Sequence, residues 1–112
     1  MTQPDPHAAH RATLHRNAAL LDAARAGTTL ARTNLVQAVD EAYFVLALAS
    51  SRRRSSEQSL AAAEAFERTT RLMQEAGEVA PIDLTRAQLQ TLIRRDELSQ
   101  AKSGEEVAAL AL

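Results

Sequence analysis

The residues best suited to chemistry in this 112-residue chain are three histidines near its start, His7, His10 and His15. Two histidines three residues apart on a helix, such as His7 and His10, share one face and could bind a divalent metal ion. The nearest carboxylate is that of Asp5, which lies among prolines, and the chain has no cysteine. We therefore expect a polar terminus here and no metal site.

The acidic residues do not suggest a catalytic pair. Glu105 and Glu106 are adjacent, as are Asp40 and Glu41, and adjacent side chains on a helix point about 100° apart. Neither pair can act as acid and base on one face. The sequence also lacks a Ser/His/Asp set, a glycine-rich phosphate loop and a quartet of metal ligands. We expect neither an enzyme nor a bound cofactor.

A basic stretch, "SSRRRSS" at residues 50–56, could be a phosphate-binding or phosphorylated patch. No aromatic residue interleaves with it, and 13 basic against 14 acidic residues give the whole chain a net charge of −1. That balance argues against a nucleic acid or an anionic membrane as partner. We expect a solvated stretch of helix, with a hinge as its alternative structural role.

The composition indicates closely packed helices. The chain has 24 alanines and 15 leucines but only three aromatic residues, Tyr43, Phe44 and Phe66, which we expect to anchor a helix seam or its flanks. No run approaches the roughly 20 apolar residues of a membrane span. Residues 1–17 have no apolar core typical of a secretory signal, so we expect this chain by itself to be soluble.

Prolines and glycines divide the chain into two helices. Pro4 and Pro6 indicate a disordered lead-in over residues 1–7, and no proline follows until Pro81. We predict a helix over 8–76, with weak points at residues 27–29 and 50–56, and a second helix over 81–112. Together, residues 8–112 form one helical hairpin domain in this prediction.

The connection at residues 77–80 has the signals of a tight turn. Gly77 can close the first helix in a left-handed conformation, and Pro81 suits the first position of the next. Asp83 falls in the first turn, where its charge favours the positive end of the helix. A connection this short forces the two helices to lie antiparallel.

Both helices carry a seam of residues that alternate steps of three and four, as in coiled coils. In the first helix the seam is Leu35, Val39, Ala42, Leu46, Ala49, Arg53, Ser56, Leu60 and Ala63, and in the second it is Leu84, Ala87, Thr91, Arg94, Leu98, Ala101, Glu105, Ala108 and Leu112. We predict an all-α fold, a long antiparallel helical hairpin. The alternative is a three-helix bundle broken near residues 50–56.

The two predicted helices differ in length, so the segment before residue 45 has no partner within the hairpin. An apolar seam without a partner needs a neighbour. We expect the chain to self-associate through this segment.

Three pieces of the sequence resemble the TolC-like family of outer-membrane efflux channels. They are "NLVQAVDEAYFVLALA" (34–49), "EQSLAAAEAFERTTRLMQEAG" (57–77) and the tip "GEVAPIDLTRAQLQ" (77–90), in which Asp83 follows Gly77 by six residues. The resemblance covers about residues 20–112. Adaptor proteins also carry α-hairpins with a glycine near the tip, but the position of Asp83 favours the channel family.

The resemblance implies a trimeric β-barrel continued by a periplasmic tunnel of helices, whose hairpin tips meet a periplasmic adaptor (membrane fusion) protein. The chain contains none of the barrel strands, so we expect it to be a hairpin segment of such a channel in the outer membrane and periplasm. The implied adaptor-binding residues are Gly77, Glu78, Val79, Ala80, Pro81, Ile82 and Asp83. The alternative function is a self-contained helical scaffold or regulator with no role in transport.

Overall fold

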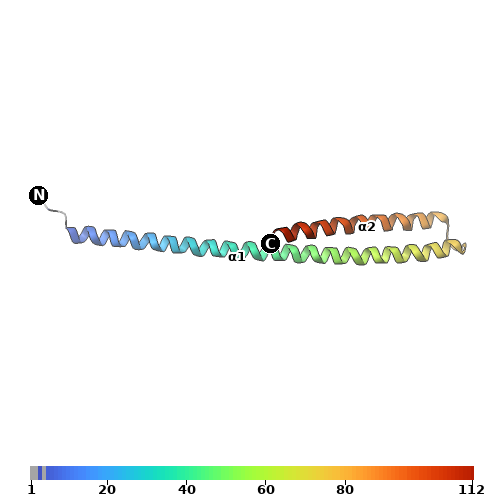
Figure 1. The fold of residues 1–112 in the computed structure, drawn as a ribbon, viewed down its shortest axis with the longest axis horizontal. Coiled ribbons are helices and arrows are strands. Elements are labelled where there is room, and N and C mark those ends of the chain that lie inside the picture. The colour runs from blue at the N-terminus through green and yellow to red at the C-terminus, as the bar shows by residue number, and fades with distance from the viewer. Residues whose placement is uncertain (1–2, 4) are drawn as a thin grey trace. The chain divides into compact units, whose positions relative to one another are not determined.

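The computed structural model of the protein describes residues 3 and 5–112, which form two helices and short connections. Helix α1 covers Pro6–Glu75 and helix α2 covers Pro81–Leu110. The chain divides into two units, Met1–Asp40 and Glu41–Leu112. Within the second unit α2 runs antiparallel along α1 (Figure 1), which confirms the predicted helical hairpin.

Helix α1 begins at Pro6, two residues earlier than predicted. The carboxylate of Asp5 accepts a hydrogen bond of 3.0 Å from the backbone N–H of His7. An aspartate cap followed by proline at the first helical position is a favourable helix start, because proline lacks only a donor that would be unpaired there. Of the predicted disordered lead-in, residues 1, 2 and 4 lie outside the described residues.

Helix α1 continues through both predicted weak points, residues 27–29 and 50–56. One glycine inside a helix costs only about 1 kcal/mol relative to alanine, too little to break a helix of 70 residues. The hydroxyls of Thr28 and Thr29 donate to carbonyls four residues earlier, each at 3.0 Å, and so stay within the helix. The alternative of a three-helix bundle broken near 50–56 is therefore wrong.

The turn after α1 has the backbone pattern that commonly closes a helix before a reversal. Gly77 has a φ of 76°, and its N–H donates to the Gln74 carbonyl at 3.0 Å. The N–H of Glu78 donates to the Met73 carbonyl at 2.8 Å. These two bonds satisfy carbonyls that the end of the helix leaves without partners.

The predicted seams face one another in the unit Glu41–Leu112. Every seam position of α1 from Ala42 to Ala63, and of α2 from Leu84 to Ala108, is buried or half-buried, and the same spacing continues in α1 through Glu67, Thr70 and Gln74; Leu112 is exposed. The most deeply buried residues are Thr70, Ala87, Thr91 and Ala108. The core of the hairpin is therefore a single narrow seam.

Small residues recur along this seam every seven residues. In α1 they are Ala42, Ala49, Ser56, Ala63 and Thr70, and in α2 they are Ala87, Ala101 and Ala108, with Arg94 at the one position of the repeat that is not small. They let the two backbones approach closely: the hydroxyl of Thr91 lies 3.2 Å from the carbonyl oxygen of Ala87 and 3.4 Å from that of Ala63 in α1. Large side chains do not fit at the positions of closest approach, and the leucines of the seam, Leu46, Leu60, Leu84 and Leu98, occupy the positions between them.

The aromatic residues lie outside the seam, so of the two expected places, the seam and its flanks, the seam is excluded. Tyr43, Phe44 and Phe66 are exposed, on the flanks or the outer face of α1. The seam positions beside them hold alanine, leucine and acidic or hydroxyl side chains instead. The rings lie outside the seam because the positions of closest approach hold residues such as alanine and threonine, which leave no room for a ring.

One ion pair joins the two seams near the open end of the hairpin. The Nε of Arg53 lies 2.6 Å from Glu105 Oε2, and its Nη1 lies 2.9 Å from Glu57 Oε1. The hydrogen bond to Glu105, followed by that to Glu57, raises the pKa of Arg53 further above its already high ordinary value. The central arginine of "SSRRRSS" is thus part of the helix contact, while Arg52 and Arg54 are exposed as predicted.

We expect Gly77→Ala to lower the free energy of unfolding by about 1–2 kcal/mol, because a β-carbon disfavours the left-handed conformation. Gly104 provides the matched control, since it is helical and a β-carbon there would meet nothing within 4 Å. Gly104→Ala should raise the stability by about 1 kcal/mol. Urea denaturation followed by circular dichroism measures both, and equal effects would contradict the assigned turn geometry.

We expect Glu105→Gln to lower the urea midpoint of the hairpin, because it leaves the guanidinium of half-buried Arg53 without its carboxylate from the facing helix. Glu106→Gln removes the same charge one residue away, on the exposed side of α2, and should change the midpoint little. Denaturation curves that coincide for the two variants would show that the pair contributes nothing to the hairpin.

Candidate functional site: the hairpin tip

The residues that the sequence singles out, Gly77–Asp83, form the turn between the helices and the first turn of α2. Gly77, Glu78, Ala80, Pro81 and Ile82 are exposed, whereas Val79 and Asp83 are half-buried. The structure therefore brings all seven together at one end of the hairpin. It does not give all of them the same accessibility.

Backbone hydrogen bonds hold the start of α2 in place. Ala80 is the cap residue, in an extended conformation with φ −72° and ψ 150°. Its N–H donates to the carboxylate of Asp83 at 3.2 Å, and its carbonyl accepts from the Asp83 N–H at 3.0 Å. Pro81 occupies the first helical position and needs no partner for its nitrogen. Asp83 therefore acts on the turn itself as well as on the helix dipole.

Of the two β-branched apolar residues at the tip, Val79 and Ile82, only Ile82 is exposed. Ile82 is 53% exposed. Val79 is half-buried, and with Phe66 and Met73 of α1 it lines a surface hollow of about 390 Å³ between the two helices. Val79 thus closes the end of the seam, and Ile82 is the apolar side chain that a partner can reach at the tip.

A second apolar stripe, which was not predicted, lies on the face of α2 turned away from α1. It consists of Ile82, Leu89, Leu92 and Ile93, which are between 43% and 57% exposed. We call these four residues the outer stripe. Their spacing of three, four and seven residues was the available signal, but the stronger alternation of the seam masked it.

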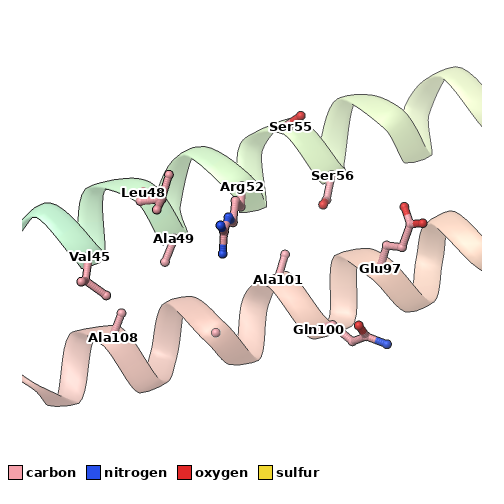
Figure 2. Close-up of a pocket in the computed structure, with 11 residues that line it drawn as sticks. Val45, Leu48, Ala49, Arg52, Ser55, Ser56, Glu97, Gln100, Ala101 and Ala108 are labelled. Atoms are coloured by element: carbon pink, nitrogen blue, oxygen red, sulfur yellow. The ribbon is translucent and has the colours of Figure 1, made fainter.

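At the open end of the hairpin a groove of about 580 Å³ lies between the helices. Val45 and Ala49 of α1 and Ala101 and Ala108 of α2 point into the space between them (Figure 2). Short side chains and Gly104 line the groove together with the longer side chains of Arg52, Glu97 and Gln100, and the groove is open to solvent. The groove follows from the small residues of the seam.

The described part of the chain holds no group of three or more metal-ligating side chains that could bind an ion. His7, His10 and His15 lie along the exposed start of α1. Among the residues that the structure describes, no helix is long and apolar enough to cross a membrane.

Comparison of the chain with protein-family models, with curated proteins and with solved structures finds no match. The function therefore has to be argued from the hairpin and its tip.

We expect Val79→Asp and Ile82→Asp to differ in stability although they lie three residues apart. Val79→Asp places a charge at the half-buried end of the seam and should lower the free energy of unfolding by about 1–3 kcal/mol. Ile82→Asp is exposed and should change it by less than about 0.5 kcal/mol. Thermal and urea denaturation test this, and a larger loss for Ile82→Asp would mean that the tip is packed differently.

Proposed function

We propose that this chain is a structural and interaction segment of a TolC-like outer-membrane efflux channel. In this function the hairpin builds part of the periplasmic helical tunnel, and its tip docks a periplasmic adaptor protein. The support is the ordered resemblance of residues 34–49, 57–77 and 77–90 to that family, together with the helical hairpin that these residues form.

The observation that carries the proposal is the amount of apolar surface that the hairpin leaves exposed. Only four of the described residues are buried. The outer stripe of α2 remains open, as do Phe66 and Leu72 of α1, which are 63% and 67% exposed. Apolar patches of this kind mark surfaces that pack against other helices. A hairpin with one covered face and further apolar faces is suited to a wall of several helices.

The tip is suited to docking because its shape is fixed before a partner arrives. Gly77 and Asp83 close the turn with hydrogen bonds that involve the backbone. Glu78 in the turn and Ile82 in the first turn of α2 are therefore held in fixed positions. Little conformational entropy is then lost when a partner binds. In the proposed mechanism the adaptor's own hairpin meets this end, with Ile82 as the apolar contact.

Packing between protomers is the second part of the proposed function. The outer stripe runs from the tip along α2, and a helix of a neighbouring copy can cover it. The same surface would then contribute to a trimeric tunnel wall in the periplasm, as in the family. Neither contact requires a catalytic group or a cofactor.

Site-specific cross-linking tests the docking directly. The chain has no cysteine, so Glu78→Cys carries the only thiol and can hold a photo-cross-linker at the tip. In cells that also make an adaptor protein, we expect adducts that mass spectrometry assigns to the adaptor's hairpin. Ile82→Asp in the same background should abolish them.

Two controls make the result specific. Gln88→Asp places the same charge on the exposed face of α2, one and a half turns further from the tip, and should leave the adduct intact. Ser99→Cys carries the cross-linker in the middle of α2 and should not reach the adaptor. Adducts that form only between copies of this chain, or adducts that persist in the Ile82→Asp variant, would contradict docking at the tip. Either result would favour a helical scaffold without a role in transport.

A further inference from the structure

The unit Met1–Asp40 carries a stripe of its own on α1, in the same alternation of three and four residues as the seam. We call it the N-terminal stripe. It consists of Leu14, Ala18, Leu21, Arg25, Thr28, Arg32, Leu35 and Val39, all of which are exposed. Apolar residues occupy its two ends, and two arginines seven residues apart occupy its centre. The N-terminal stripe is therefore a mixed surface, apolar at both ends and cationic in the middle.

The two arginines flank a hollow in the surface. Arg25 and Arg32 line a depression of about 530 Å³ together with Leu21 and Thr28. The hydroxyl of Thr28 donates to a carbonyl of its own helix at 3.0 Å, and neighbouring Thr29 does the same. The hydrogen-bond donors left to face the hollow are thus guanidinium groups, which suit a carboxylate.

No carboxylate of the described chain lies in salt-bridge range of either arginine; the ion pairs that form involve other residues. The hairpin indicates what an arginine at such a position requires. Arg53 has the equivalent place in the paired seam, and a carboxylate of the facing helix, Glu105, lies 2.6 Å from it. A helix facing the N-terminal stripe should supply carboxylates in the same way.

We propose that the N-terminal stripe docks a helix of a different protein, one with two carboxylates seven residues apart between leucine-sized apolar side chains. The apolar groups would cover Leu14, Leu21, Leu35 and Val39, and the carboxylates would pair with Arg25 and Arg32. This contact goes beyond the proposed docking at the tip and does not depend on it.

A second copy of the chain does not offer suitable carboxylates. Glu57 and Glu64 are its only acidic residues seven positions apart. Both already have partners in the hairpin: Glu57 lies 2.9 Å from Arg53, and Glu64 lies 3.7 Å from Arg95. The charge pattern therefore favours an acidic helix of another protein at this stripe, and self-association through the segment before residue 45 is the alternative that the test below distinguishes.

A membrane surface is also a poor occupant. A helix that lies on a membrane keeps its charged residues beside or opposite its apolar face. Here Arg25 and Arg32 interrupt the row of leucines, so insertion of the apolar ends would carry two guanidinium groups toward the acyl chains. A helical partner can place a carboxylate opposite each arginine.

The test uses the full chain and two synthetic helical peptides of about four heptads. One peptide has leucines along one stripe with two glutamates seven residues apart at its centre, and the other has lysines in place of those glutamates. We expect the glutamate peptide to bind about tenfold more tightly, since two ion pairs replace two like-charge contacts. Fluorescence anisotropy of labelled peptide gives both affinities.

Charge reversal then assigns the binding to the N-terminal stripe. Arg25→Glu/Arg32→Glu should lower the affinity for the glutamate peptide and raise the affinity for the lysine peptide. Arg16→Glu/Arg54→Glu changes the net charge equally at exposed positions outside the stripe, and should still prefer the glutamate peptide. Because the variants lie far along the sequence from the tip, cross-linking at Glu78 should be unaffected.

Three results would overturn the proposal. The first is equal affinity for the two peptides. The second is a concentration-dependent association of the chain alone, in sedimentation, that Arg25→Glu/Arg32→Glu abolishes, which would make a second copy the occupant. The third is binding to phosphatidylglycerol vesicles that the same variant abolishes, without a difference between the peptides, which would make a membrane surface the occupant.

Discussion

The close approach of two helix backbones is the constraint on which the rest of this hairpin depends. Small residues at every seventh position bring the Thr91 hydroxyl to within 3.4 Å of a carbonyl oxygen on the opposite helix. At the positions of closest approach alanine and threonine fill the contact, leucines occupy the seam positions between them, and aromatic side chains lie outside the seam. The exposed rings of Tyr43 and Phe66, and the outer stripe of α2, follow from that exclusion.

The same constraint explains why so many apolar side chains of the hairpin remain exposed. A seam of alanines buries little apolar area, and apolar burial is the dominant favourable term in folding. The side chains excluded from the seam remain available to partners at the tip, along the outer stripe and, in the other unit, along the N-terminal stripe. Folding of the hairpin therefore uses only part of the apolar residues, and the proposed partners would cover others.

Much of the hairpin could be predicted from the sequence because its signals are local. Gly77, Pro81 and the alternation of three and four residues determine the turn and the seam without reference to distant contacts. The half-buried position of Val79 depends instead on how the two helices converge, which local spacing does not report. The Arg53–Glu105 pair could also have been predicted from the sequence, because both residues lie 26 positions from Val79 on opposite helices. Opposite charges equidistant from a tight turn are a usable signal of antiparallel pairing.

The short turn also has a kinetic consequence. The sequence distance between paired residues grows steadily from the tip: 5 residues for the Glu78–Met73 bond, 28 for Thr91–Ala63 and 52 for Arg53–Glu105. Closing a longer loop costs more entropy, so the chain gains by pairing first beside Gly77 and extending the contact residue by residue. The hairpin therefore closes from the tip toward its open end, and amide hydrogen exchange should be slowest in the seam near the tip and fastest at the end of α2.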